Sequence, residues 1–445
     1  MENKKTIFIT SFFGLIARNI LDTDVLKILS LKENLSIVVL APAEKKESYE
    51  ERFGGTNVKI EGLNFKKPSR KESFLAALFL NALDTDSRRI CRFTEAKQHN
   101  RWVGFIFWTL IAKLSRFSFF RRFLRWLDYR FSDKENFSNL FQKYSPDMVF
   151  STDIFEPHDV IVIREAKKRG IPILGMVRSW DNITTHGLNR FIPGSLVVNT
   201  PSIKNETVKY NDIEPKDIFV SGIPHYDKYI KHRNISKEEL FKKLNLDPSK
   251  KTVFFAPTPN IFSKDNPVNP VAIKKLLDLD VQLILRLYFV GDVNLGAFKA
   301  VPGKIAIDAP SESPDSLRSD LRVNDKLADL LYHSDVVVAF ASTLAVDAVV
   351  FGKPVVFIGF DGAKNYPYWK SLRRFYDFDH QKSLLNTGGI KLATNPDDFS
   401  FYIKDYLANP DLDKEGRQRI VQEKCWKLDG GSGRRLAEYI ISRVK

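Results

Sequence analysis

Strand-like and helix-like segments alternate along almost the whole chain, and this order restricts the folds that it can adopt. Two apolar runs, "KTIFITS" (5–11) and "LSIVVLAP" (35–42), have the length and β-branched content of buried strands. Between them, residues such as Ile16, Ile20 and Leu29 recur at helical spacing. A strand, a helix and a strand in this order predict a βαβ unit, and repeated units predict a parallel sheet covered by helices.

The alternation forms two series, separated by a charged, turn-prone segment at 226–251. Further strands of the first series are expected at 147–153, 171–177, 195–200 and 218–222. Those of the second series are expected at 252–258, 281–289 and 303–308, in both apolar runs of 336–358, and at 389–394. With 445 residues, 43% of them hydrophobic, the chain can fill two cores. We therefore predict two doubly wound α/β domains that face a central cleft, with a boundary near 230–250 and a closing helix at 433–445.

The stretch "VVVAFASTLAVDAVVFGKPVVFI" (336–358) contains the most specific candidate binding motif. A strand ends just before Ser342, and a helix is expected to begin near Thr343, so that its first free amides and its dipole make an anion site. Asp347 follows one turn later, where a carboxylate can accept both hydrogen bonds of a ribose diol. This pattern predicts a nucleotide site. The alternative is that Ser342 only caps the helix and Asp347 is a solvated residue.

Acidic and histidine side chains follow two consecutive strands of the first series. Asp153 follows the strand at 147–153, and Asp181 and His186 follow the strand at 171–177. Group transfer to a hydroxyl needs a general base, and either type of side chain can act as one within hydrogen-bonding reach. Asp153 or Asp181 is the predicted base, with His186 as the third candidate. The alternative is that Asp181 and Asn182 form an Asx-type turn.

Other loops at strand ends supply candidate contacts to the two substrates. Gly14 and Arg18 follow the first strand, and Trp180 and Asn182 follow the strand at 171–177, so these four residues are predicted to contact an acceptor. Thr258, in "APTPN" (256–260), is predicted to face the donor diphosphate. The segment "GLIARN" does not satisfy the G-x-G-x-x-G fingerprint, which argues against an NAD site.

The stretch "SDVVVAFASTLAVDAVVFGKPVVFIGFDG" resembles the nucleotide-binding segment of GT-B fold glycosyltransferases, especially the branch of CDP-glycerol glycerophosphotransferase-like and other surface-polysaccharide enzymes. Three further motifs carry the same resemblance: "VFFAPT", "IFVSGIPHYD" (218–227) and "DGGSGRR" (429–435). The likeness spans most of the chain and is strongest from 195 to 445. The last motif also places Gly430, Gly431 and Ser432 at a helix N-terminus, as an additional anion contact.

The resemblance implies a GT-B enzyme with two Rossmann-like domains. Residues 1–240 would form the N-terminal acceptor domain, with a basic aromatic insertion at about 70–140, and residues 241–445 the C-terminal nucleotide-donor domain. The implied activity is transfer of a sugar from a nucleotide-sugar donor to a surface-polysaccharide or lipid-linked acceptor. Polyol-phosphate transfer from a CDP-alcohol, 2-epimerisation of a sugar nucleotide, and a non-enzymatic scaffold at a membrane surface are the alternatives.

One segment departs from the pattern of that branch. Where the branch tends to carry Leu-His-Pro after a central strand, this chain has Arg286, Leu287, Tyr288 and Phe289. The departure argues against polyol-phosphate transfer. Arg286 still offers positive charge to the donor.

A basic and aromatic segment at 112–132 directly follows the apolar run 102–114. The uncharged part of that run has 11 residues, too few to span a bilayer. Arginines mixed with aromatic residues favour a helix in the headgroup layer of an anionic membrane, in keeping with the net charge of +15. The alternative is a pair of core helices whose arginines face solvent. No nucleic-acid-binding module is found, so no nucleic-acid partner is expected.

The sequence argues against several classes of site. The two cysteines, Cys91 and Cys425, lie far apart, which argues against a disulfide framework or a cysteine-ligated zinc site. No HExxH, Walker A or G-x-S-x-G motif occurs, and the N-terminus lacks the apolar region of a secretory signal. We expect a metal-independent enzyme with no cofactor besides its nucleotide-sugar substrate. We expect it in the cytoplasm, held peripherally at the inner face of the cell membrane.

Overall fold

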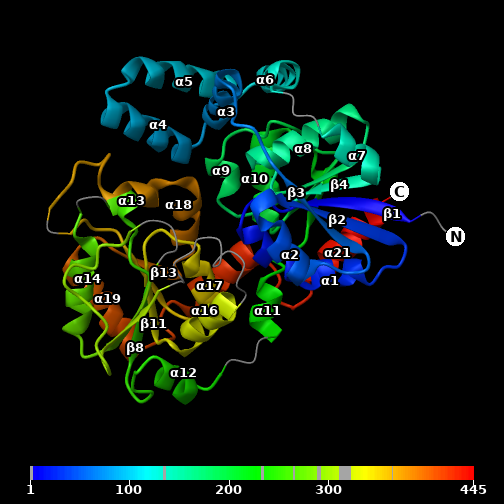
Figure 1. The fold of residues 1–445 in the computed structure, drawn as a ribbon. Coiled ribbons are helices and arrows are strands. Elements are labelled where there is room, and N and C mark those ends of the chain that lie inside the picture. The colour runs from blue at the N-terminus through cyan, green and yellow to red at the C-terminus, as the bar shows by residue number, and fades with distance from the viewer. Residues whose placement is uncertain are drawn as a thin grey trace. The chain divides into compact units, whose positions relative to one another are not determined.

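Figure 1 shows the fold in a computed structural model, which describes residues 4–133, 137–231, 235–263, 266–287, 292–309, 322–362 and 364–444. The chain divides into two compact units. Unit 1 comprises residues 1–230 and 425–445, and unit 2 comprises residues 231–424. Each unit has its own parallel sheet, as the alternating strands and helices predict.

Unit 1 is built on a seven-stranded parallel sheet in the order β3-β2-β1-β4-β5-β6-β7. Its strands are β1 (Lys5–Thr10), β2 (Leu35–Pro42), β3 (Val58–Leu63), β4 (Met148–Ser151), β5 (Ile173–Met176), β6 (Ser195–Val198) and β7 (Ile218–Val220). Its helices and short turns before β4 are η1 (Ala17–Leu21), α1 (Asp24–Ser30), η2 (Ala43–Lys45), α2 (Lys46–Phe53), α3 (Arg70–Asn81), α4 (Asp86–His99), α5 (Trp102–Leu114), α6 (Ser118–Phe131) and α7 (Ser138–Tyr144). Those after β4 are α8 (Pro157–Lys168), α9 (Asn182–Thr185), α10 (Pro201–Asn211), η3 (Pro215–Asp217), α11 (Tyr226–Lys231) and α21 (Ser432–Arg443). The central strands β1, β4 and β5 are largely buried on both faces, as expected for a parallel sheet covered by crossover helices.

Unit 2 is built on a six-stranded parallel sheet in the order β10-β9-β8-β11-β12-β13. Its strands are β8 (Thr252–Phe255), β9 (Gln282–Arg286), β10 (Ile305–Asp308), β11 (Val336–Ala339), β12 (Val355–Ile358) and β13 (Ile390–Ala393). Its helices and turns are α12 (Lys237–Lys243), α13 (Asn260–Ser263), α14 (Val268–Leu277), α16 (Arg322–His333), α17 (Leu344–Val350), η4 (Leu372–Asp377), α18 (Asp379–Leu385), α19 (Pro396–Ala408), α20 (Lys414–Ile420) and η5 (Val421–Cys425). The central strands β8 and β11 pair from Val336 opposite Val253 to Val338 opposite Phe255.

Every strand predicted from the sequence is present, and one further strand, β3, is not predicted. Lys59 of β3 is exposed and the strand lies at the edge of its sheet, so its polar alternation gives a weak signal. The single helix expected after β1 is instead the π-helical turn η1 followed by α1. Thr23 separates them because its hydroxyl accepts a hydrogen bond from Val25 N at 3.2 Å and begins a new helix.

The last helix, α21, belongs to unit 1, whereas the sequence pattern assigns it to the second domain. Its buried residues Leu436, Ala437 and Ile440 pack into the same apolar cluster as Val25 and Leu29 of α1. The apolar face of a helix must be covered, and here α1 covers it. Unit 2 begins at residue 231, ten residues before the predicted start at 241, and the prediction did not include the return of the chain to unit 1.

Two motifs of the sequence meet where α21 begins. The carboxylate of Asp227, from "IPHYD", accepts hydrogen bonds from Ser432 N at 3.1 Å and Gly433 N at 2.7 Å. Gly222 has φ +83°, and a Cβ there would lie 2.5 Å from the Ser432 hydroxyl oxygen. Of the residues expected to bind an anion at "DGGSGRR", Ser432 thus already donates its amide to Asp227, and Gly431 donates its amide to Asp429 at 3.0 Å.

Helices α3 to α6 form the insertion predicted at about 70–140, and α4 and α5 lie side by side in Figure 1. Leu75, Leu78 and Phe79 of α3 form a small core with Leu124 of α6 and Leu188. No single helix in the described residues is long and apolar enough to cross a membrane, while α5 and α6 together pass that test but are bent by 113°. At about 1.5 Å per residue, the 13 residues of α5 reach about 20 Å, short of the roughly 30 Å of a hydrocarbon core.

Candidate functional site

Both sheets reverse their strand order at one point, and the predicted site residues follow the strands at these points. In unit 1 the reversal lies between β1 and β4, and in unit 2 it lies between β8 and β11. Open parallel sheets bind ligands beyond the carboxyl ends of the strands at such switch points. Asp153 follows β4, and Ser342 and Thr343 follow β11. Topology therefore places one set of candidates in each unit.

At the switch point of unit 1, Asp153 forms a buried ion pair with Arg178. Arg178 Nε donates to Asp153 Oδ2 at 2.7 Å, and Phe155 N donates to Oδ1 at 3.1 Å. Burial raises the pKa of Asp153, and the Arg178 guanidinium opposes that shift. Arg178 also lies over the ring of Phe13, 3.8 Å from its centroid. Arg178 is not among the site residues predicted from the sequence, although its position directly after β5 is the signal that it shares with Asp181.

A second buried carboxyl group, that of Asp159, lies close to Asp153. Its Oδ1 accepts hydrogen bonds from the hydroxyl groups of Thr10 and Ser151, at the ends of β1 and β4, the latter at 2.7 Å. Its Oδ2 has no hydrogen-bond partner among the described residues. Burial raises the pKa of Asp159 well above the usual range, and the two hydroxyl donors offset this only in part. Burial of this kind favours the protonated, neutral form of a carboxyl group.

The segment after β5 brings together Asp181, Asn182 and His186. Asp181 precedes α9, and its carbonyl accepts a hydrogen bond from the Thr185 hydroxyl at 2.7 Å. Asn182 is fully enclosed, and its side chain contacts Ser179 N at 2.8 Å and His186 Nδ1 at 3.1 Å. The Asn182 side-chain oxygen thus accepts from residue 179, three residues earlier, and not from residue 184 as in the Asx-type turn considered for Asp181 and Asn182. Trp180 is 9% exposed, so it packs in the interior.

His186 is the accessible member of this group. The residue is exposed overall, but its ring lies against Asn182 and Thr185, and this partial desolvation lowers its pKa. Asp181 and Asp153 act in the opposite direction and favour the charged imidazolium. A neutral imidazole beside two carboxylates can accept a proton and hold it.

The two remaining acceptor candidates lie in the loop after β1. Gly14 is buried, and Arg18 is half-buried in the π-helical turn η1. Arg18 Nε donates to the side-chain oxygen of Asn19 at 2.8 Å. Both residues therefore lie at the end of β1, on the same edge of the sheet as Asp153.

In unit 2 the chain turns sharply after β11, and side chains from distant segments hold the turn. Ala341 has φ +35°, a left-handed conformation that costs about 1–3 kcal/mol for a residue other than glycine. Its amide donates to the Tyr376 hydroxyl at 3.2 Å, and its carbonyl accepts from Gln381 Nε2 at 3.2 Å. The Tyr376 hydroxyl in turn donates to the carbonyl of Ile358 at 2.8 Å, and burial raises its pKa, which keeps it protonated. No sequence signal near Tyr376 or Gln381 indicates this role.

The turn leaves two backbone amides available. The Ser342 hydroxyl accepts from Leu344 N at 3.2 Å, and the carbonyl groups of Ser342 and Thr343 accept from the next amides of α17. Among the described residues, the amides of Ser342 and Thr343 have no hydrogen-bond acceptor. Thr343 is exposed. Ser342 therefore caps the helix, as the alternative interpretation expects, while two amides beside it remain free to bind an anion.

Asp347 and Thr258 are both more enclosed than expected for direct ligand contacts. Asp347 lies on α17 as predicted but is 7% exposed, so a ribose can reach only an edge of its carboxylate. Thr258 is completely buried. Its backbone is clamped by Asn269, whose side chain accepts from Thr258 N at 2.8 Å and donates to Thr258 O at 2.9 Å. Asn269 thus fixes the loop after β8 from α14.

Arg286, at the end of β9, pairs with the buried carboxylate of Asp308. Lys326 pairs with the other oxygen of Asp308 at 2.5 Å. Two cations on one carboxylate leave a net positive charge next to the switch point. Tyr288 and Phe289, which follow Arg286 in the segment that departs from the family pattern, lie outside the described residues.

Within the part of the chain that the structure describes, no group of three or more His, Cys, Asp or Glu side chains is arranged to hold a metal ion. The candidate residues instead offer backbone amides and cations in unit 2, and carboxylates and an imidazole in unit 1. Such groups can bind a diphosphate and move a proton, respectively.

Two doubly wound units with polar groups at their switch points define a GT-B type fold, and solved structures agree. UDP-GlcNAc 2-epimerase from Neisseria meningitidis, bound to UDP-GlcNAc, superposes with a TM-score of 0.57 at 12% identity over 99% of this chain and 100% of that chain. S. aureus MnaA in a structure with UDP superposes with a TM-score of 0.55 at 14% identity, over 98% of this chain and 96% of that chain. The wall teichoic acid polymerase TagF, soaked with CDPG, superposes with a TM-score of 0.53 at 13% identity, over 100% of this chain and 90% of that chain. At these identities the likeness concerns the fold alone.

The family follows from the sequence. Residues 194–442 match the CDP-glycerol:poly(glycerophosphate) glycerophosphotransferase family. The chain belongs to this family, which confirms the resemblance carried by its motifs. No curated protein matches the chain in sequence.

The buried carboxyl of Asp159 predicts a specific pH dependence of stability. Because its pKa in the folded state lies above the unfolded value of about 3.9, the folded state binds more protons between these two values. The free energy of unfolding therefore falls as the pH rises through this window. Asp159→Asn keeps the shape but does not titrate, so it should be more stable than the wild type at neutral pH by about 1 kcal/mol or more.

Urea unfolding at several pH values from about 4 to about 8 measures this difference. Asp280→Asn, at an exposed position, serves as the matched control and should follow the wild-type curve. Parallel curves for Asp159→Asn and the wild type would show that the carboxyl does not remain protonated in the folded state.

Proposed function

We propose that this protein is a GT-B transferase that moves a glycosyl group from a nucleotide-activated donor to a surface-polysaccharide or lipid-linked acceptor. The family match over residues 194–442 is the observation that carries the proposal, because it includes the whole switch point of unit 2. Nucleotide ligands in the neighbouring solved structures support a nucleotide donor. No cofactor besides the donor is required.

In this proposal, unit 2 binds the donor. The free amides of Ser342 and Thr343 bind a phosphate oxygen each, and the strained turn at Ala341 keeps them in place. Arg286, with Lys326 sharing the charge of Asp308, adds positive potential for the leaving group. Charge that develops on a departing phosphate is thus stabilised by groups that are already in position. Asp347 contributes through the edge of its carboxylate to the ribose.

Unit 1 contributes the acceptor contacts and the base. Asp153 is 2% exposed and both of its oxygens accept hydrogen bonds, so it is poorly placed to take a proton from an acceptor. His186 is exposed, and its lowered pKa favours the neutral form at physiological pH. We therefore assign the base to His186, with Asp153 and Asp181 as the charges that stabilise the imidazolium. Gly14, Arg18, Trp180 and Asn182 then shape the acceptor side.

Polyol-phosphate transfer from a CDP-alcohol is the second candidate, favoured by the name of the family to which the chain belongs. Epimerisation of a sugar nucleotide is the third, favoured by the epimerase neighbours. A donor panel separates the three. Acceptor-dependent release of a nucleoside diphosphate supports glycosyl transfer, and acceptor-dependent release of CMP from a CDP-alcohol supports polyol-phosphate transfer. Conversion of a sugar nucleotide without any acceptor would support epimerisation.

The donor site can be tested at one backbone amide. Thr343 has φ −59°, which already suits proline, and its N–H has no partner among the described residues. Thr343→Pro should therefore fold normally but bind the preferred nucleotide roughly tenfold more weakly, because one hydrogen bond to a charged phosphate is lost. Isothermal titration measures the affinity. Thr343→Ala, which keeps the amide, is the control, and equal affinities for the two variants would contradict the site.

The base can be identified from turnover. His186→Gln should lower kcat by roughly 10² to 10⁴, with little effect on donor affinity. His99→Gln removes an exposed histidine of α4 and should leave turnover unchanged. Asp153→Asn and Asp181→Asn should have smaller effects than His186→Gln. If either aspartate variant loses more activity than His186→Gln, the base is that aspartate.

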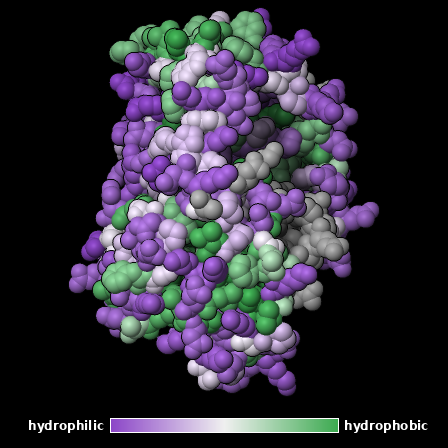
Figure 2. Space-filling view, turned by 90° about the vertical axis from the view of Figure 1, so that its left-hand side faces the viewer, coloured by the Kyte–Doolittle hydropathy of each residue, from purple (hydrophilic) through white to green (hydrophobic). Residues whose placement is uncertain are grey.

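We further propose that the protein binds the inner face of an anionic cell membrane through α5 and α6. One face of α5 and one of α6 expose large apolar side chains, and together they form the apolar surface of these helices. Its members are Trp102, Val103, Ile106, Phe107, Leu110, Leu114, Phe117, Phe119, Phe123, Trp126, Tyr129 and Phe131. Figure 2 shows hydrophobic side chains gathered at the top of the molecule, the level at which α5 lies in Figure 1. A patch of this size on a folded protein marks an interaction site.

The arginines of this segment fall into two groups. Arg121 and Arg125 pair with Asp212, with side chains at most 14% exposed, and Arg116 pairs with Asp84. Arg122 and Arg130 are exposed, with no carboxylate within 4 Å among the described residues. Arg122 and Arg130 have no carboxylate in the described part of the chain that competes with lipid phosphates, whereas Arg121 and Arg125 are enclosed, so a test of membrane binding should leave Arg121 and Arg125 in place.

Substitution on the apolar surface should weaken membrane binding. Phe119 is 69% exposed, and burying a phenylalanine in lipid contributes about 1.5–3 kcal/mol, so Phe119→Glu should lower vesicle partitioning by at least about tenfold. Phe401→Glu, at a 59% exposed phenylalanine of α19, is the control. Co-sedimentation with vesicles containing phosphatidylglycerol measures both. Equal partitioning of the two variants would rule out docking through α5 and α6.

A further inference from the structure

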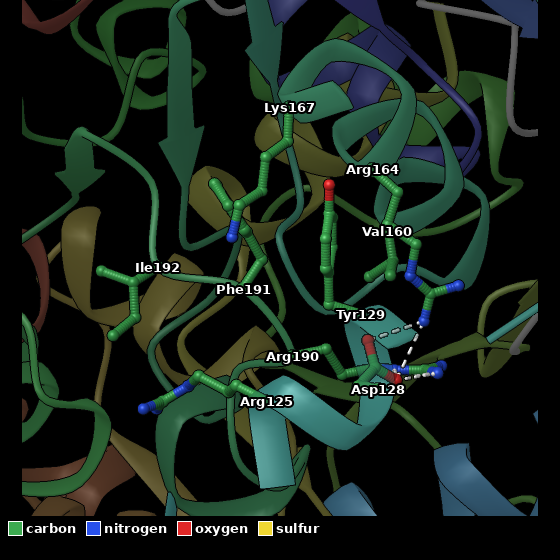
Figure 3. Close-up of a pocket in the computed structure, with 9 residues that line it drawn as sticks. All are labelled: Arg125, Asp128, Tyr129, Val160, Arg164, Lys167, Arg190, Phe191 and Ile192. Carbon is green, nitrogen blue, oxygen red and sulfur yellow. Dashed lines mark hydrogen bonds and ion pairs between the residues drawn. The ribbon is translucent and has the colours of Figure 1, made fainter. Parts of the chain in front are cut away.

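A hollow of about 140 Å³ lies in unit 1 between α6, α8 and the segment that precedes β6. Figure 3 shows its lining, in which Lys167 extends toward the rings of Tyr129 and Phe191. Arg125, Arg164 and Arg190 also contribute to its walls. None of the candidate catalytic or donor residues lines it. Its role is therefore separate from the chemistry proposed above.

The charges around this hollow do not balance. Arg164 and Arg190 both pair with the buried carboxylate of Asp128, the former at 2.8 Å, and both also reach Glu72. Arg125 pairs with Asp212 at 2.8 Å. The ion pairs join four arginines to three carboxylates: Arg164 and Arg190 with Glu72 and Asp128, and Arg121 and Arg125 with Asp212. Lys167 adds a fifth positive charge without belonging to any of these pairs. The local charge is therefore positive.

Two donors of the lining have no acceptor among the described residues, one on the exposed Lys167 and one on the buried Arg164. The ammonium of Lys167 lies 4.9 Å from the ring centroids of both Tyr129 and Phe191, and no carboxylate of the described residues lies within 4 Å of it. Arg164 is 7% exposed, and its Nε donates to no acceptor among the described residues. A buried guanidinium donor without a partner is costly, and an anion beside it would remove that cost. Both observations indicate that the hollow is suited to an anionic group.

We propose that this hollow binds the phosphate of a phosphate ester, and that its source is the headgroup of an anionic phospholipid. Lysine and arginine donors bind phosphate through charge-assisted hydrogen bonds. The walls formed by Val160 and Ile192 accept the apolar part of the ester. Tyr129 belongs both to this lining and to the apolar surface of α5 and α6, so the hollow opens next to the proposed membrane surface. The lipid source rests on that membrane proposal, whereas binding of a soluble ester does not.

The experiment compares two neighbouring lysines of α8 in the full chain. Lys167→Gln removes the unpaired ammonium, and Lys168→Gln removes the same charge from a lysine that pairs with Glu165. Each variant and the wild type are titrated with glycerol phosphate and with vesicles of phosphatidylcholine, with and without phosphatidylglycerol. We expect Lys167→Gln to bind glycerol phosphate and phosphatidylglycerol vesicles roughly tenfold more weakly, and Lys168→Gln to match the wild type.

Each outcome decides one part of the proposal. If both variants bind every probe equally well, the hollow is no phosphate site and the proposal is overturned. If only the affinity for glycerol phosphate falls in Lys167→Gln, the phosphate site stands and the lipid source is overturned. If vesicle binding by Phe119→Glu is lost while Lys167→Gln still weakens binding of glycerol phosphate, the membrane surface and the phosphate site both stand. Lys167→Arg, which keeps the charge, should restore binding.

Discussion

Each polar group that a parallel sheet buries at its carboxyl edge must be neutralised or hydrogen-bonded, and this requirement shapes both functional edges of the protein. In unit 1, burial favours the neutral form of Asp159, whereas Asp153 accepts hydrogen bonds from Arg178 and from a backbone amide. In unit 2, Asn269 satisfies the backbone of Thr258, and Tyr376 and Gln381 satisfy the peptide groups on either side of Ala341. The residues that hold these loops come from neighbouring helices and turns. Loops held in this way are rigid before any substrate arrives.

The same requirement separates structural charge from surface charge in the helical insertion. Arg121 and Arg125 are held by Asp212, which fixes α6 against the segment after α10. Removing one partner of a buried ion pair of this kind strongly destabilises a protein. The exposed Arg122 and Arg130 form no such ion pair among the described residues. A single amphipathic helix thus attaches itself to unit 1 with one set of arginines and presents another set, with its aromatic residues, to the outside.

Sequence patterns predict much of this architecture because parallel strands buried on both faces leave short, continuous apolar runs. The runs at 5–11 and 252–258 are clear for this reason, while β3, with exposed Lys59 at a sheet edge, is not. The position of Thr343 and His186 after strands could be predicted from chain order alone. The enclosure of Asp347 and Asn182 could not, because it depends on helices that pack over them. The hydrogen bonds of Tyr376 to Ala341 and of Arg178 to Asp153 join residues far apart in the chain, so they leave no local pattern in the sequence.

The return of α21 to unit 1 has a consequence for how the protein is made. Leu436, Ala437 and Ile440 complete the core that begins with the first strand and helix. During synthesis, residues 231–424 of unit 2 are made before the helix that covers the apolar face of α1. That face of the nascent unit 1 therefore stays uncovered while unit 2 is made, and residues 425–445 are the segment that covers it.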